Sequence, residues 1–184
     1  LHSEHSKKSK VDLIQHFQTI KNVIVDRINE VDTIIFTFGS AFVYKHLQKE
    51  IYVANCHKIP AKEFEKHLLS VEDIVESFNK FNSAINKVNE NVKFIFTISP
   101  VRHLRDGLEN NTISKSTLRL AIHEIQKTQQ NTHYFPSFEL LIDDLRDYRF
   151  YKDDLLHPTV FAQEYVWEKF CDTYFNEETN SLTK

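Results

Sequence analysis

Two short runs of β-branched and aromatic residues constrain the fold of this chain more than any other feature. Asp32–Phe38 (DTIIFTF) and Val92–Ile98 (VKFIFTI) are apolar at most positions, and they end at Gly39 and at Ser99-Pro100. Such runs are typical of strands that are buried on both faces, as in a parallel sheet. Because a helical pattern follows each run, we expect the two strands to be adjacent and parallel. The alternation of strands and helices predicts an α/β fold with a mainly parallel sheet.

The other elements follow from hydrophobic spacing and from capping residues. Apolar residues recur at helical spacing from Val11 onward, and Ser70 with Asp73 forms a capping-box pattern ahead of a second helix. Thr132–Phe135 is predicted as a third strand. We expect further helices over Pro60–Leu69, after a cap at Ser116, over Phe138–Leu145 and up to about Tyr174, with loops over Arg102–Asn111 and Arg146–Leu156.

The chain reads as one domain over residues 1–184, with a flexible stretch at residues 1–10. Three strands are few for this class, in which about five or more are usual. The chain also begins at Leu1 and contains no methionine. We therefore expect an N-terminal βα portion of the domain to lie outside this sequence.

Composition excludes several functional classes. With 23 basic and 26 acidic residues, a net charge of −3 and no basic stripe, the chain is not expected to bind nucleic acid. Two glycines are too few for a glycine-rich phosphate loop or a dinucleotide-binding fingerprint. The two cysteines, Cys56 and Cys171, fit neither a disulfide framework nor a cysteine-based zinc site. With no signal peptide and no apolar run near the ~18 residues of a membrane span, we expect a cytoplasmic protein without membrane contact.

Chemically useful residues follow each predicted strand. In open α/β sheets, ligands bind beyond the carboxyl ends of the strands. Gly39-Ser40-Ala41 follows the first strand, Ser99-Pro100-Val101-Arg102-His103 follows the second, and Asp153–Pro158 lies between the third strand and the last helix. We expect these three segments to converge at one end of the sheet.

Asp154-x-x-His157 has the arrangement of a catalytic base. The carboxylate can hold one ring nitrogen of the imidazole, which leaves the other nitrogen to take a proton from a hydroxyl nucleophile. About 0.6 such pairs are expected by chance from 10 histidines and 11 aspartates in 184 residues, so the tetrapeptide alone carries no weight. The pair lies just before the last helix. With this position taken into account, a catalytic base and a loop histidine held by a local carboxylate are equally plausible interpretations of His157. We predict hydrogen-bond contact between the two side chains.

The other candidates have strong structural alternatives. Ser40 follows a strand and a glycine, as a nucleophile does, but it fits a turn or cap serine better. In Asn55-Cys56-His57, a buried cysteine beside a polar histidine is favoured over a thiol or metal site, because neighbouring side chains in an extended segment point to opposite faces. Arg102 and His103 could bind an anionic substrate group or belong to a solvated loop. The scattered histidines give no helical His-x-x-x-His pair, and no metal or cofactor is expected.

At these same segments the sequence resembles the GSCFA family, which belongs with the SGNH (GDSL-like) hydrolases. The resemblance runs from about residue 32 to residue 175. It is carried by FTFGSAFVY (Phe36–Tyr44), VANCHK (Val53–Lys58), TISPVRH (Thr97–His103), SKSTLRLAIHEI (Ser114–Ile125), YFPSFELLIDDLRDYRFY (Tyr134–Tyr151) and DDLLHP (Asp153–Pro158).

The resemblance implies a flavodoxin-like three-layer α/β/α sandwich with strand order 2-1-3-4-5. It also implies a serine nucleophile in a Gly-Ser-Cys-Phe-Ala motif after the first strand, with His157 as general base and Asp154 as its orienting carboxylate. Gly39 and Ser40 fall at the oxyanion segment that the resemblance implies, where Ala41 replaces the usual asparagine. The donors would then be backbone amides or the Ser40 hydroxyl, and Asn55 is a candidate substitute donor. The chain contains no Ser-Cys dipeptide, so the motif that names the family is absent from these 184 residues.

Two hypotheses of function follow from the resemblance. In the first, the chain is the C-terminal portion of a serine esterase or acyltransferase and contributes the Asp-x-x-His base, with a small ester or an acylated carbohydrate as substrate. In the second, it is a catalytically silent binding or scaffold domain of the same fold. A Gly-Ser-Cys-Phe-Ala segment upstream of Leu1 would favour the enzyme.

Overall fold

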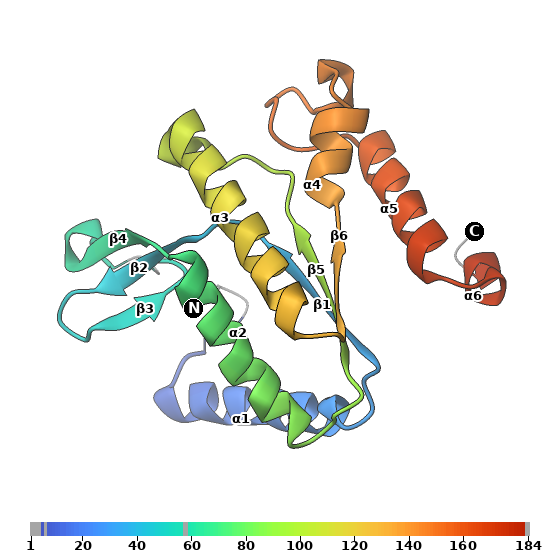
Figure 1. Ribbon diagram of the computed structural model, residues 1–184. Coiled ribbons are helices and arrows are strands. Elements are labelled where there is room, and N and C mark those ends of the chain that lie inside the picture. Colours follow the sequence, from blue (N-terminus) through green and yellow to red (C-terminus); the bar gives the residue numbers. More distant parts are fainter. Residues whose placement is uncertain (1–4, 6, 57–58, 183–184) are drawn as a thin grey trace.

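A computed structural model describes residues 5, 7–56 and 59–182, and its centre is a parallel sheet of three strands (Figure 1). The strands are β1 (Thr33–Phe38), β5 (Lys93–Ile98) and β6 (Thr132–Phe135), in the order β1-β5-β6. β1 pairs with β5 in parallel from Thr33 opposite Lys93 to Phe38 opposite Ile98. The predicted adjacent parallel strands, the third strand and the α/β class are therefore confirmed.

Helices α2 (Val71–Asn86) and α3 (Gly107–Thr128) pack together on one face of this sheet (Figure 1). The predicted capping box at the start of α2 is present, because the Ser70 hydroxyl accepts from the Asp73 amide and the Asp73 carboxylate accepts from the Ser70 amide. Phe78 of α2 stands edge-on to Phe94 and Phe96 of β5, with ring centroids 5.2 and 5.0 Å apart. These rings form the centre of the main core.

Helix α5 (Val160–Tyr174) lies over the opposite face, where Phe170 packs edge-on against Phe135 of β6 at 5.1 Å. This side of β1 is open, and Ile35 is 52% exposed. The prediction that the first strand is buried on both faces is therefore wrong. β5 lies between two strands and is buried along most of its length, whereas β1 is the edge strand of the described sheet.

A second, antiparallel sheet follows β1 directly, in the order β3-β2-β4. Its strands are β2 (Phe42–His46), β3 (Ile51–Val53) and β4 (Phe64–Leu68), and a single 3₁₀ turn, η2 (Ala61–Glu63), precedes β4. The predicted helix over Pro60–Leu69 is therefore wrong. Phe64 and Leu68 are four residues apart, a spacing that places side chains on one face of a helix and also on one face of a strand. Pairing with β2 over five residues decides in favour of the strand.

The start of α3 also differs from the prediction. The helix begins at Gly107, whose φ of 80° is readily adopted only by glycine, so Ser116 lies inside the helix and is not its cap. Much of the predicted loop over Arg102–Asn111 is therefore helical, including the short turn η3 (Leu104–Asp106).

The remaining predicted helices are present. They are α1 (Lys10–Ile28), the short α4 (Ser137–Glu139) continued by a π-helical turn η4 (Leu140–Asp144), and α5; a 3₁₀ turn η5 (Tyr148–Phe150) and a terminal α6 (Glu177–Leu182) were not predicted. Ser9 caps α1, whereas residues 1–4 and 6 of the stretch predicted to be flexible lie outside the described residues. Among the described helices, none combines the length and the apolarity needed to cross a bilayer.

Candidate functional site

Lys115 of α3 connects the two loops that follow β1 and β5. Its side chain is 3% exposed, and its ammonium group donates to the Gly39 carbonyl at 2.7 Å and to the Ser99 carbonyl at 2.6 Å. Burial lowers the pKa of Lys115 to about 8, so the charged form still predominates at pH 7. The carboxyl ends of the two strands are therefore held together by one buried cation.

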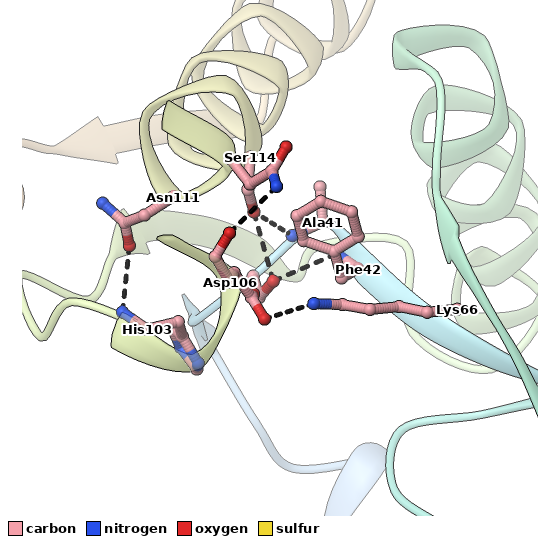
Figure 2. A network of polar contacts seen from close by, with 9 residues as sticks. Ala41, Phe42, Lys66, His103, Asp106, Asn111 and Ser114 are labelled. Atoms are coloured by element: carbon pink, nitrogen blue, oxygen red, sulfur yellow. Dashed lines mark hydrogen bonds and ion pairs between the residues drawn. The ribbon is translucent and has the colours of Figure 1, made fainter. Parts of the chain in front are cut away.

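Two neighbours of Lys115 on the same helix face hold the loops at further points (Figure 2). The Ser114 hydroxyl accepts from the Ala41 amide at 2.7 Å and lies 3.1 Å from the Ser40 hydroxyl. The Ser40 oxygen also accepts from the Phe42 amide at 3.0 Å. Asn111 accepts from the His103 amide at 3.0 Å. Ser40 thus takes part in a structural network, and the chain after it enters β2 instead of the helix that follows a nucleophile elbow.

The predicted contact between Asp154 and His157 is confirmed. One carboxylate oxygen of Asp154 lies 2.6 Å from Nδ1 of His157, and the other accepts from the amides of Leu156 and His157 at 2.9 Å each. The His157 carbonyl in turn accepts from the Lys152 amide at 2.8 Å. The His157 side chain is 55% exposed, and no hydrogen bond to its Nε2 is found within the described residues. The imidazole is therefore oriented by a carboxylate and open to a ligand.

These contacts lower the pKa of Asp154 to about 2, and the bond from the His157 amide contributes most, ahead of the His157 ring and the Leu156 amide. Since the pKa in the folded chain lies below the unfolded value, the ionised carboxylate stabilises this loop above about pH 3.8, and that contribution is lost as the pH falls through about 2. We expect a carboxyl ¹³C NMR titration of Asp154 to have its midpoint near 2.

His157→Ala should raise this midpoint, but not to the ordinary aspartate pKa of 3.8, because the two amide bonds remain. Asp147, whose pKa is lowered by contacts with Arg149, serves as the control and should titrate identically in both proteins. A wild-type midpoint near 3.8 would contradict the geometry of this loop.

The three segments that follow the strands converge on one polar cavity of about 670 Å³. Five of the residues singled out from the sequence line it: Ser40, Asn55, Arg102, His103 and His157. Gly39 lies next to His103. A Cβ atom at Gly39 would be 3.3 Å from Nε2 of His103, so a larger residue at this position would crowd the imidazole. Asn55 also has a contact partner, so its side chain is not free. His57, the other residue of this segment singled out from the sequence, lies outside the described residues.

His157 also lines a second, apolar groove of about 490 Å³ between the open face of the sheet and α5. Its walls include Ile35 of β1, Phe135 of β6, and Trp167 and Phe170 of α5. The candidate base therefore stands between an apolar groove and a polar cavity.

Sequence reasoning missed several residues of this site. Lys66 of β4 forms an ion pair with Asp106 of η3 and lies 4.2 Å above the ring of Phe42, which fixes the 102–106 loop over the second sheet (Figure 2). Asn111, Ser114 and Lys115 were missed because the start of α3 was predicted too late. Within the described residues, no group of three or more potential metal ligands comes together.

Comparison with known proteins gives one match. The model of the GSCFA family matches residues 1–170. No curated protein and no solved structure was found to match the chain.

Proposed function

This chain belongs to the GSCFA family, and on that premise we propose that it supplies the general base of an acyl-transfer site, in a serine esterase or acyltransferase. The observation that carries the proposal is the 2.6 Å contact between Asp154 and Nδ1 of an exposed His157. A carboxylate in this position fixes the tautomer in which Nε2 carries a lone pair and can accept a proton.

In the proposed reaction, Nε2 of His157 takes the proton of a serine hydroxyl while the serine oxygen attacks the ester carbonyl carbon. The bond between the carbonyl carbon and the alcohol oxygen then breaks, and the imidazolium returns its proton to the departing alkoxide. Water or an acceptor alcohol then gives its proton to Nε2 of His157 and attacks the acyl carbon. The bond between that carbon and the serine oxygen breaks, and the serine oxygen takes the proton back from the imidazolium. We assign the negative carbonyl oxygen to the backbone amides of Gly39 and Ser40, with Asn55 as an additional donor, because the Ala41 amide already donates to the Ser114 hydroxyl.

The serine is placed, in this proposal, in the Gly-Ser-Cys-Phe-Ala motif of the family, on a segment that is not among these 184 residues. Two observations are compatible with that position. β1 has no partner strand on its outer edge within the described residues, and the groove beside His157 is open along Ile35. The finer fold proposal is a flavodoxin-like sandwich in which β1, β5 and β6 are the last three of five parallel strands.

A catalytically silent domain is the second candidate, and one observation favours it. Ser40, the serine that follows a strand and a glycine, bonds to Ser114 and Phe42, and none of the described residues offers a hydroxyl bonded to His157. The two candidates differ in whether an acyl-enzyme forms.

The test is acylation of the full-length protein by an activated aryl acetate, followed by intact and peptide mass spectrometry. We expect one acetyl group on a serine of the Gly-Ser-Cys-Phe-Ala motif, and no acetylated serine in His157→Ala. His123→Ala, at an exposed histidine of α3, is the matched control and should be acetylated like the wild type. Absence of acetylation in the wild type, or equal acetylation in His157→Ala, would favour the silent domain.

A further inference from the structure

The polar cavity beside His157 has an excess of positive charge, although the chain as a whole has a net charge of −3. Its lining contains the cations Lys66, Arg102 and Arg105, and Asp106 is the one acidic residue among the described residues that line it. Asp106 is already paired with Lys66, and its side chain is only 10% exposed. Two guanidinium groups therefore remain without a compensating carboxylate in the cavity.

Neither guanidinium group forms an ion pair elsewhere in the described part of the chain. The guanidinium carbon of Arg102 lies 5.8 Å from the centre of the Tyr151 ring. This arrangement differs from that of Arg149, an exposed arginine that is paired with Asp147 at 3.2 Å. Arg102 and Arg105 are thus available to a ligand.

The loop that carries both arginines is held in place from two sides (Figure 2). Asn111 of α3 accepts from the His103 amide, and the Lys66–Asp106 ion pair ties η3 to β4. Because the backbone of this loop is already fixed, less conformational entropy is lost when its side chains bind an anion. Guanidinium groups match the planar, two-oxygen edge of a phosphate, a sulfate or a carboxylate.

From these observations we infer that Arg102 and Arg105 form an anion-binding subsite, and that the substrate of this site carries a phosphate, sulfate or carboxylate group in the polar cavity. The identification of the bound molecule as a substrate depends on the proposed function, because it depends on His157 acting at the edge of the same cavity. The anion site itself does not depend on the proposed function. The cavity volume of about 670 Å³ is within the range of small-molecule sites.

Binding is tested without turnover on the full-length protein, by NMR titration with phenyl phosphate, phenyl sulfate, benzoate and, as the uncharged probe, benzyl alcohol. We expect the anions to shift the Nε–H signals of Arg102 and Arg105, and benzyl alcohol to leave them unchanged. The anion with the lowest Kd identifies the oxyacid class. In the double variant Arg102→Gln/Arg105→Gln, that Kd should rise at least about ten-fold.

The matched control is Arg27→Gln/Arg146→Gln, which removes the same charge from two exposed arginines outside the cavity and should leave the Kd within about two-fold of the wild type. Equal Kd values in the two double variants, or no shift of the Arg102 and Arg105 signals, would overturn the anion site. If anions bind as expected but no acyl-enzyme forms, the anion site stands and the proposed function fails. If an acyl-enzyme forms but anions do not bind at these arginines, the proposed function stands and the anion site fails.

Discussion

We expect Asp154→Asn to lower kcat for ester hydrolysis by about 10³- to 10⁴-fold, because the proposed reaction needs the carboxylate of Asp154 to orient His157. Asparagine keeps an oxygen that can accept from the Leu156 and His157 amides, so the loop retains its shape. Its amide nitrogen, however, donates to Nδ1 of His157. The proton of the neutral imidazole then resides on Nε2, and that nitrogen can no longer accept a proton from the nucleophile.

The measurement is steady-state hydrolysis of an aryl ester by the full-length protein, with Asp153→Asn as the control. Asp153 is the exposed neighbour of Asp154 and forms no hydrogen bond with His157 among the described residues, so its variant should keep kcat within about two-fold. A fall of less than ten-fold in Asp154→Asn, with kcat of Asp153→Asn unchanged, would show that the carboxylate does not orient a catalytic imidazole.

The features that the sequence predicted correctly depend on residues close together in the chain. The strands β1 and β5 are continuous apolar runs, and the capping box at Ser70 and the Asp154–His157 contact each join residues three positions apart. Local spacing determines such contacts, and a sequence pattern is sufficient to detect them.

The errors arose where a local pattern fits two structures. Phe64 and Leu68 share a face in a helix and in a strand alike, and in β4 the same face is completed by Lys66, whose side chain lies over the Phe42 ring. A lysine between two apolar residues indicates a helix more readily than a strand. Only the pairing with β2, about 20 residues earlier in the chain, resolves the ambiguity.

The polar face of α3 was missed for a different reason, although a signal was present. Leu118, Ile122 and Ile125 form the buried stripe of this helix, and the same periodicity continued toward the N-terminus reaches Ser114, Lys115 and Asn111. Because glycine is a poor helix former, Gly107 was not expected at the first position of α3, and the start of the helix was predicted too late. The partners of these side chains could not have been predicted in any case, since Lys115 bonds to Gly39, 76 residues away.

Lys115→Met should cause the largest loss of stability among these variants. Methionine has a similar length and fills the same space, but it leaves the buried carbonyls of Gly39 and Ser99 without their shared donor. Each buried carbonyl that loses its hydrogen-bond donor costs roughly 1–3 kcal/mol of stability. Part of this loss is offset, because the variant no longer buries the charge of Lys115. We therefore expect the free energy of unfolding to fall by about 2 kcal/mol or more, which corresponds to a Tm lower by roughly 4–8 °C.

Urea and thermal unfolding followed by circular dichroism measure this loss, and Lys127→Met on the same helix is its matched control. Lys127 is exposed and pairs with Glu124 at 2.6 Å, a surface contact of the kind that contributes little to stability. Because the two variants share the substitution and the helix, the difference between them isolates the two carbonyl bonds of Lys115. Equal stability of the two variants would mean that Lys115 does not hold the ends of β1 and β5 together, and the loops that carry Ser40 and Arg102 would then need another support.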